Sequence, residues 1–402
     1  DKALKMMLKG QPVSAGEGLA NGVIDRVDES GDLISASMDF MLETTAGKHP
    51  RIPTRERTEG LQDEAANHVA IGEHRNTWQK KGKGLYSPFQ IIDCVEKALS
   101  TPFEEGLKYE RESFARCLES PQRKGLIHAF FAERRCRKIP ELREIEPRKL
   151  ERLAVIGGGT MGGGIAVAAL DAGLEVMMVE RDEAGLEKGR LNVEKVYDRH
   201  ISKGRMGPED KKEVLGRFIL STDFERIADA DMVIEAVFEE MEVKKEVFRI
   251  LDQYARQGAV LASNTSYLDI DEIASVTSRP EEVLGLHFFS PANIMKLLEI
   301  VVPSGLSNEV LATGFALGNR MGKVPVRSAN SEGFIGNRIL GAYSKVAGYM
   351  MEDGTSPYRI DEAVRGFGYP IGPFQMFDLA GGDIGWANRK RKAATRDPKE
   401  RY

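Results

Sequence analysis

One histidine and one glutamate, His287 and Glu299, stand twelve residues apart in the apolar stretch GLHFFSPANIMKLLEI. Imidazole ionises near neutral pH and can accept a proton during a reaction. A carboxylate on its second ring nitrogen fixes the tautomer and stabilises the imidazolium. A strand, a turn through residues 290–293 and a return strand fit this spacing. The pattern predicts a general base with an orienting acid, but it also fits a core histidine and an unrelated surface acid.

A glycine-rich turn lies upstream, in LAVIGGGTMGGGIAVAAL. Gly157, Gly159 and Gly162 form G-x-G-x-x-G directly after a strand-like run and before an alanine-rich helix. In a dinucleotide site the first glycine allows the tight turn, the second lets the backbone approach the pyrophosphate, and the third allows close helix packing. We therefore expect a dinucleotide site here rather than an ordinary glycine turn. Its further contact candidates are Thr160, Met161 and Ala236.

An acidic residue, Glu180, follows the next strand-like run, EVMMV, about 20 residues after the glycine turn. In a dinucleotide site an acid at this place accepts hydrogen bonds from the adenosine ribose and repels a 2′-phosphate. The neighbouring Arg181 argues in the opposite direction, because a cation favours that phosphate. On balance the sequence predicts NAD rather than NADP.

The elements that must position these residues alternate between short β-branched runs and amphipathic helices over residues 151–330. This alternation predicts a Rossmann-type α/β domain, with a parallel sheet covered by helices on both faces. After Gly333 the strand-like runs stop, which predicts an all-α C-terminal domain over residues 331–402. Ligands of open α/β folds bind beyond the carboxyl ends of the strands. We expect one crevice to collect the residues at those ends: Gly157, Glu180, Glu239, Asn264 and His287, with Asn337 closing it from the helical domain.

The first 150 residues divide into two parts. Residues 1–45 suggest a helix near residues 3–8, a second helix in SAGEGLANG and a strand in VIDRV, too little to enclose a core alone. Residues 46–150 read as connector and linker, with a polar surface connector over about residues 45–84 and helices over 88–137. The chain lacks an initial methionine and ends in ATRDPKERY, so we expect it to be cut at both ends.

Composition narrows the function classes. The chain has 402 residues, of which 41% are apolar and 30% charged, with a net charge of −5, as in ordinary globular proteins without a nucleic-acid or membrane footprint. No apolar run approaches the ~20 residues of a membrane span. The three cysteines, Cys94, Cys117 and Cys136, stand far apart in the sequence and away from histidine clusters. We therefore expect no metal site and no disulfide framework, and a reducing compartment fits this pattern.

With these residues placed, the stretch from Leu153 to about Trp386 resembles the 3-hydroxyacyl-CoA dehydrogenase family. The matching motifs are VIGGGTMGGGIA, IEAVFEEMEVKKEVF, SNTSYL, GLHFFSPANIMKLLEIV, GFIGNRIL and GYPIGPFQMFDLAG. KALKMMLKGQPVSAGEGLANGVIDRV is similar to the end of an enoyl-CoA hydratase (crotonase) domain, and FFAERRCRKIP to the linker of bifunctional fatty-acid oxidation enzymes. The likeness covers nearly the whole chain.

The resemblance implies NAD-dependent oxidation of (S)-3-hydroxyacyl-CoA to 3-ketoacyl-CoA, with His287 as general base and Glu299 as its partner. It further implies that Asn337 and Ser266 help to hold the substrate oxygen and the histidine. Glu239 and Lys244 match positions near the nicotinamide ribose, and Asn264 lies on the same cofactor-facing loop.

Two other functions stay open at this point. One is an NAD-dependent hydroxyacid dehydrogenase of another family, although those use a lysine base. The other is a non-catalytic NAD-binding relative. Hydratase activity is not expected, because no position in residues 1–45 matches the catalytic glutamates of a crotonase. The resemblance suggests other β-oxidation enzymes such as a thiolase as partners, and a bacterial cytoplasm or a peroxisome as location. The sequence does not indicate acyl chain length or oligomeric state.

Overall fold

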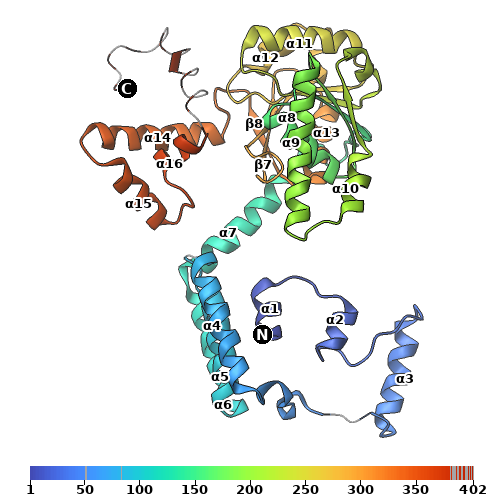
Figure 1. Ribbon diagram of the computed structural model, residues 1–402, viewed down its shortest axis with the longest axis vertical. Coiled ribbons are helices and arrows are strands. Elements are labelled where there is room, and N and C mark those ends of the chain that lie inside the picture. Colours follow the sequence, from blue (N-terminus) through green and yellow to red (C-terminus); the bar gives the residue numbers. More distant parts are fainter. Residues whose placement is uncertain are drawn as a thin grey trace. The chain divides into compact units, whose positions relative to one another are not determined.

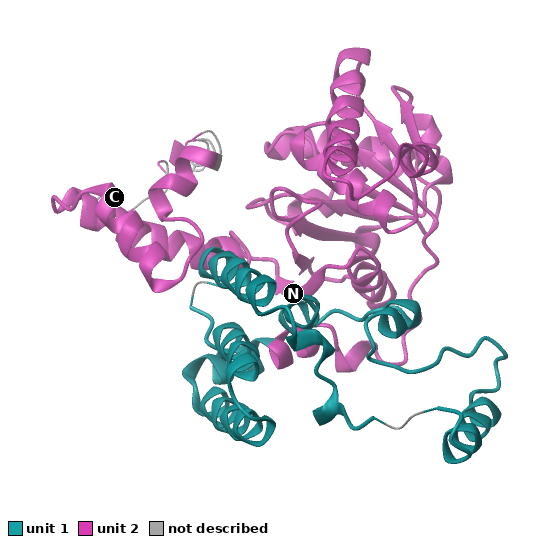
Figure 2. Ribbon diagram, turned by 60° about the horizontal axis from the view of Figure 1, so that its bottom comes forward, with its two compact units in different colours: residues 1–129 teal, residues 130–402 magenta. Residues whose placement is uncertain are grey.

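The computed structural model describes residues 1–49, 52–82, 84–380, 382, 386, 389, 390, 393, 397, 399 and 401. The chain divides into two compact units, residues 1–129 and 130–402 (Figure 2), which are considered separately. Most of the closing stretch ATRDPKERY lies outside the described residues.

The first unit is helical. Its small core joins Leu4, Ile71 and Ile92, one residue from each of α1, α4 and α5. Helix α7 crosses the boundary between the units. The elements are α1 (Lys2–Lys9), α2 (Ala15–Ala20), α3 (Leu33–Thr45), η1 (Thr54–Glu56), η2 (Glu59–Leu61), α4 (Glu64–Lys81), α5 (Ser87–Ser100), α6 (Phe103–Glu119) and α7 (Pro121–Cys136).

Two sequence-based predictions for this unit are wrong. The stretch VIDRV forms bends instead of a strand, and its Val23 side chain is exposed. No described strand of this unit lies beside it to complete a backbone ladder, and a strand needs such a partner. The expected polar connector contains an 18-residue helix, α4. The polar composition of this segment does not indicate a helix, but ion pairs with α5 stabilise it. Arg75 of α4 pairs with Asp93 (2.8 Å) and Glu96 (2.7 Å).

The second unit is built on an eight-stranded sheet in the order β3-β2-β1-β4-β5-β6-β7-β8. All of these strands lie within residues 151–330, where the sequence predicts alternating strands and helices. The sheet is parallel from β1 to β6, but β7 runs antiparallel to β6 and β8 follows β7. The connection of residues 289–296 is too short for a parallel crossover, so the chain returns in the opposite direction. The strands are β1 (Arg152–Ile156), β2 (Glu175–Val179), β3 (Phe218–Ser221), β4 (Met232–Glu235), β5 (Val260–Ser263), β6 (Val283–Phe288), β7 (Leu297–Val302) and β8 (Val324–Ala329).

Helices cover both faces of the sheet (Figure 1). On one face Val155 and Ile300 pack among apolar residues of α8, α9 and α13, with α10 at the margin. On the other, Ala154 and Val233 pack against η4, α11 and α12. This two-faced burial confirms the predicted Rossmann-type domain. The elements are α8 (Thr160–Asp171), α9 (Glu183–Ser202), α10 (Pro208–Leu215), α11 (Met241–Tyr254), α12 (Ile270–Ala274), α13 (Asn308–Arg320), η3 (Pro140–Leu142), η4 (Phe224–Asp229) and η5 (Pro280–Glu282).

Three helices follow β8: α14 (Gly336–Glu352), α15 (Pro357–Phe367) and α16 (Pro373–Ala380). Asp361 of α15 accepts hydrogen bonds from the backbone amides of Phe374 and Gln375 at the start of α16, both 2.9 Å long. The described residues after β8 contain helices and no strand, as predicted for the C-terminal domain.

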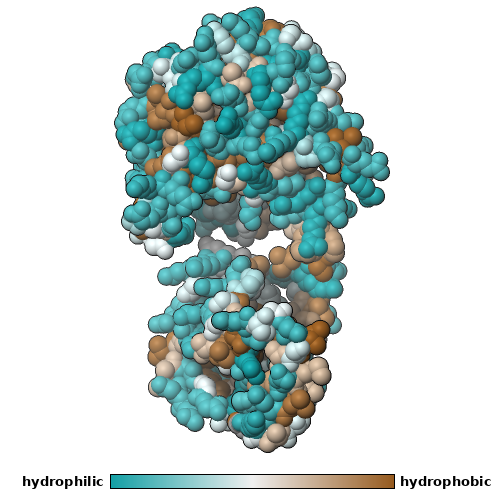
Figure 3. All heavy atoms as spheres, turned by 90° about the vertical axis from the view of Figure 1, so that its right-hand side faces the viewer, coloured by the Kyte–Doolittle hydropathy of each residue, from teal (hydrophilic) through white to brown (hydrophobic). Residues whose placement is uncertain are grey.

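The surface of the larger unit is mostly hydrophilic on the face that Figure 3 shows, where hydrophobic residues form small separate groups. None of the described helices has the length and apolar composition that crossing a bilayer requires.

Candidate active site

The predicted site residues gather at the carboxyl edge of the sheet. Gly157 and Glu180 directly follow β1 and β2, Ala236 and Asn264 directly follow β4 and β5, and His287 is the penultimate residue of β6. Because β7 is antiparallel, Glu299 near its start reaches the same edge. The sheet therefore brings together residues that lie up to 142 positions apart (299 − 157) in the chain.

His287 and Glu299 face each other directly in the β6–β7 ladder. The distance from His287 Nδ1 to Glu299 Oε2 is 2.6 Å, and the two side chains are 5% and 0% exposed. The other carboxylate oxygen of Glu299 accepts hydrogen bonds from the backbone amides of Ile335 (2.9 Å) and Gly336 (2.7 Å). Both oxygens are thus fixed, and the second ring nitrogen of His287, Nε2, is left for other partners.

The charge of Glu299 follows from these contacts. Burial raises the pKa of this carboxyl, but the hydrogen bond to His287 and the amides of Gly336 and Ile335 outweigh burial, so the net pKa is lowered. Glu299 is therefore a carboxylate at neutral pH. The carboxylate accepts a hydrogen bond from the N–H group of His287 Nδ1. The imidazole therefore carries its proton on Nδ1, and its Nε2 is free to accept a proton from a substrate.

Two phenylalanines that the sequence analysis missed enclose the imidazole. The ring centroid of His287 lies 4.5 Å from that of Phe289 and 5.5 Å from that of Phe334. Phe334 is buried and is a non-glycine residue with a positive φ, 48°. This left-handed conformation precedes the two amides that bind Glu299, and a bulky residue adopts it only where the surroundings impose it. The motif GFIGNR holds the residue, but nothing in the sequence indicates its conformation.

Gly336, the first residue of α14, provides a test of this packing. A Cβ at this position would lie 2.8 Å from Cζ of Phe289, so we expect Gly336→Ala to lower the free energy of unfolding by about 1–2 kcal/mol. Denaturant unfolding measures the change. Adding Phe289→Leu should recover part of the loss by making room for the methyl group.

Two other glycines of the same helix serve as matched controls. Gly341 and Gly348 have no foreign atom within 4 Å of a built Cβ. Alanine there should stabilise the protein by about 0.5–1 kcal/mol, the ordinary gain in helix propensity. If Gly336→Ala were stabilising like these two, the close contact with Phe289 would be refuted.

The loop after β5 lies beside the histidine. Asn264 Oδ1 accepts the backbone amide of Phe288, the residue next to His287, at 2.9 Å. The backbone amide of Ser266 donates to Glu239 Oε1 at 2.7 Å, and Nδ2 of Asn337 donates to the Ser266 carbonyl at 3.4 Å. Asn337 therefore contacts the backbone of Ser266. In the part of the chain that the structure describes, no hydrogen bond joins Asn337 to His287.

Lys244 occupies a buried position that its charged helix sequence does not suggest. Its ammonium lies 2.6 Å from Glu235 Oε1 and 3.5 Å from Glu239 Oε2, and its side chain is 1% exposed. Glu235 and Thr265 belong to the same hydrogen-bonded group, and the sequence analysis identified neither. A glutamate at the end of an apolar strand, directly before Ala236, is the signal that could have revealed Glu235.

The glycine turn has the shape that a pyrophosphate requires. Gly157 has a φ of 105°, and a Cβ there would lie 2.8 Å from the carbonyl oxygen of Ala236. A Cβ on Gly162 would collide with the carbonyl of Gly157, whereas one on Gly159 would meet nothing within 4 Å. Gly159 is the N-cap of α8, whose first turn begins with Thr160 and Met161 and whose first amides have no helical acceptors. The residues fit a dinucleotide.

Glu180 lies against the same turn. Its Oε1 accepts the backbone amide of Gly158 at 2.7 Å, so the carboxylate is fixed at the end of β2. The Arg181 side chain is 82% exposed and pairs with Asp182 at 3.0 Å, directed to its own helix start. The cation that argued for NADP is therefore engaged by a neighbouring acid.

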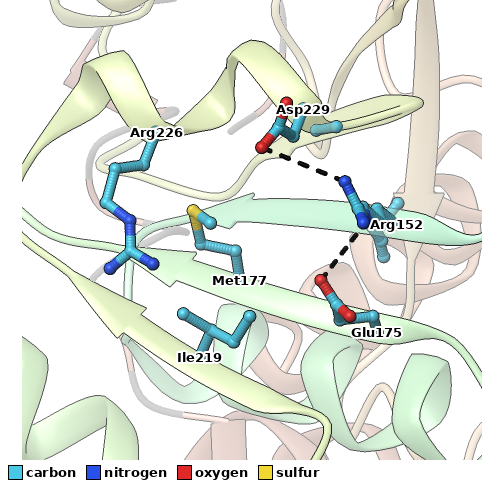
Figure 4. A pocket seen from close by; sticks show the side chains of 8 residues that line it. Arg152, Glu175, Met177, Ile219, Arg226 and Asp229 are labelled. Atoms are coloured by element: carbon cyan, nitrogen blue, oxygen red, sulfur yellow. Dashed lines mark ion pairs between the residues drawn. The ribbon is translucent and has the colours of Figure 1, made fainter.

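Other candidate sites are not supported. Among the described residues no group of histidines, cysteines and acids is arranged to hold a metal ion. A cavity of about 220 Å³ lies beside Arg152 and Glu175, the first residues of β1 and β2 (Figure 4). Arg152 pairs there with Glu175 (3.5 Å) and Asp229 (3.9 Å). This cavity is at the amino ends of the strands, opposite to the predicted site residues.

Two family models match the second unit. "3-hydroxyacyl-CoA dehydrogenase, NAD binding domain" matches residues 152–331, and "3-hydroxyacyl-CoA dehydrogenase, C-terminal domain" matches residues 333–402. Among curated proteins, the peroxisomal bifunctional enzyme of Danio rerio is 39% identical over 99% of this chain and 55% of its own length. The fatty acid oxidation complex subunit alpha of Shewanella amazonensis is 32% identical over 96% of this chain and 55% of its own length.

Solved structures match the larger unit. (S)-3-hydroxybutyryl-CoA dehydrogenase PaaH1 from Ralstonia eutropha is 35% identical, with a TM-score of 0.59, over 62% of this chain and 90% of its own. 3-Hydroxybutyryl-CoA dehydrogenase from Escherichia coli is 36% identical, with a TM-score of 0.57, over 60% of this chain and 51% of its own. The chain spans about half the length of the curated relatives it matches.

Proposed function

The chain belongs to the 3-hydroxyacyl-CoA dehydrogenase family, and we propose that it oxidises (S)-3-hydroxyacyl-CoA to 3-ketoacyl-CoA with NAD as hydride acceptor. The observation that supports this most is the buried 2.6 Å contact of His287 with Glu299 at the edge of the sheet that carries the glycine turn. A base and a dinucleotide turn in one crevice are the two parts that oxidation of an alcohol requires.

In this proposal His287 Nε2 accepts the hydroxyl proton as the hydride leaves C3 of the substrate. Glu299 holds the ring in the required tautomer and stabilises the imidazolium. NAD, when bound, supplies the nicotinamide carbon that takes the hydride. Ser266 and Asn337 would direct the substrate oxygen toward His287, a role that the hydrogen bond from Asn337 to the Ser266 carbonyl supports.

Glu299 also connects the base to the helical domain. Because the amides of Ile335 and Gly336 fix one carboxylate oxygen, the start of α14 helps to orient His287. We propose that the start of α14 takes part both in substrate binding by the helical domain and in proton abstraction by His287. The acyl-CoA is the proposed partner, and hydratase chemistry is not proposed for this chain.

The cellular setting is proposed from the relatives alone. The name of the Danio rerio protein places that enzyme in the peroxisome, and the Shewanella protein is part of a fatty acid oxidation complex. We propose a peroxisome or a bacterial cytoplasm for this chain, and other β-oxidation enzymes, such as a thiolase, as its partners.

The activity is tested by following NADH absorbance with 3-hydroxyacyl-CoA substrates of several chain lengths. The expected result is NADH formation that depends on the (S) enantiomer. Free 2-hydroxy acids are the comparison substrates for the alternative dehydrogenase class. Turnover of those acids alone would refute the proposed substrate class, and NAD binding without turnover of any substrate would favour a non-catalytic relative.

Glu180 tests the choice of cofactor. We expect Glu180→Ala to raise the ratio of kcat/KM for NADP over that for NAD by about tenfold, because it removes a negative charge that repels the 2′-phosphate. Initial rates with both cofactors give the ratio. Glu213→Ala, at an exposed acid of α10, is the matched control and should leave the ratio unchanged. Equal use of both cofactors by the parent would contradict the role given to Glu180.

A further inference from the structure

A cluster of two glutamates and one lysine lies beside the Ser266 loop. Glu235 is the last residue of β4, Lys244 belongs to α11, and Glu239 lies in the connection between them. The side chains of Glu235 and Lys244 are 0% and 1% exposed, and that of Glu239 is 31% exposed. The cluster therefore runs from the buried sheet to a partly exposed side chain.

The hydrogen bonds of the cluster indicate the charges of its three side chains. Glu235 accepts from the amide of Val237 (2.8 Å), the hydroxyl of Ser263 (2.7 Å) and the ammonium of Lys244 (2.6 Å). These groups donate, as an ionised carboxylate requires. Glu239 Oε1 accepts from the Thr265 hydroxyl and the Ser266 amide in the same way. Two carboxylates (−2) and one ammonium (+1) leave one negative charge (−2 + 1 = −1).

This excess charge lies close to where the hydride must move. Glu239 binds the backbone of Ser266, and Asn264 of the same loop binds the residue next to His287. In a reactive complex the nicotinamide carbon and the substrate carbon lie about 3–3.5 Å apart, with the hydroxyl group of that carbon on His287. The loop of residues 264–266, which contacts both Glu239 and the neighbour of His287, would therefore border the nicotinamide ring.

We propose that the Glu235–Lys244–Glu239 cluster shifts cofactor binding toward the oxidised form relative to the reduced form. The inference rests on the proposed function, since it needs NAD in the crevice. The ring of NAD⁺ carries a positive charge that NADH lacks, while the rest of the two molecules is the same. A fixed negative charge near the ring stabilises the charged form selectively. Glu235 and Lys244 act here as positioning residues that set the charge around Glu239.

The test is the ratio of the dissociation constants, Kd(NAD⁺)/Kd(NADH), measured by calorimetric titration of the folded protein. For Glu235→Gln the cluster becomes neutral, and we expect the ratio to rise about fivefold, because the lost charge is partly screened by solvent at the exposed Glu239 end. A purely structural role for Glu235 would weaken both forms equally and leave the ratio unchanged.

Further variants keep the proposal testable if Glu235→Gln fails to fold. Glu239→Gln also removes one negative charge from the cluster, at its more exposed residue. The ratio Kd(NAD⁺)/Kd(NADH) should therefore rise in this variant too. Lys244→Met leaves two negative charges and should change the ratio in the opposite direction. Glu246→Gln, at an exposed acid of the same helix, is the matched control and should not change the ratio.

The outcomes separate this inference from the proposed function. If the parent bound neither NAD⁺ nor NADH, both would be refuted. If the parent bound both forms and turned over substrate, but the ratio stayed the same in Glu239→Gln and Glu235→Gln, the inference alone would be overturned. A rise in both variants with no change in Glu246→Gln supports it.

Discussion

We expect His287→Ala to lower kcat for the proposed 3-hydroxyacyl-CoA oxidation by about 10³-fold, within the range that a general base contributes. The reason is geometric: His287 is the imidazole at the crevice whose Nδ1 is held by an ionised carboxylate, so its Nε2 is the acceptor available for the hydroxyl proton. The loss should appear in kcat, because the variant removes a contact that is strongest in the transition state. Initial rates of NADH formation measure it.

Controls separate lost chemistry from lost structure. His287→Gln keeps most of the side-chain volume between Phe289 and Phe334 and should be as inactive as the alanine variant. Kd for NADH should change little in either, since the proposed dinucleotide contacts at Gly157, Glu180 and Ala236 follow β1, β2 and β4 and do not include His287. His128→Ala, at an exposed position of α7, should behave like the parent. Turnover by His287→Ala at the parental rate would exclude the histidine as base.

The sheet and the pairing of His287 with Glu299 could be predicted from the sequence because each depends on a local pattern. β-Branched runs between amphipathic helices define the strands, and the twelve-residue spacing fits a hairpin that sets the two side chains opposite each other. The predicted roles of the catalytic and cofactor residues stay predictions until they are tested by substitution.

What the sequence did not reveal depends on contacts between distant segments. Lys244 lies in VKKEVF, where charged residues normally face solvent, and its burial arises because Glu235 of β4 faces it across the fold. The left-handed Phe334 and the two amides on Glu299 lie where the chain enters α14, and Ile335 follows Glu299 by 36 residues in the sequence. Helix α4 was missed because its stabilising ion pairs join it to another helix.

Glu299→Gln should be nearly as damaging as loss of the base, with kcat lower by about 10²–10³-fold. The amides of Ile335 and Gly336 can only donate, so they fix the oxygen of the new side chain on their side. The amide nitrogen of the glutamine then faces His287 Nδ1 and donates to it. This forces the proton onto Nε2, and in that tautomer the ring cannot accept a proton from the substrate. Initial rates and the KM for the acyl-CoA measure the effect, and KM should change little.

The same substitution has a pH signature in stability. The folded-state pKa of Glu299 is lowered, so its contribution to stability is present above the ordinary glutamate pKa and is lost as the pH falls through the lowered folded value. Glutamine does not titrate. The difference in unfolding free energy between parent and Glu299→Gln should therefore shrink as the pH falls below about 4. A difference that stayed constant or grew in acid would show that the carboxylate is not held ionised by His287 and the start of α14, and the explanation of the tautomer would fail with it.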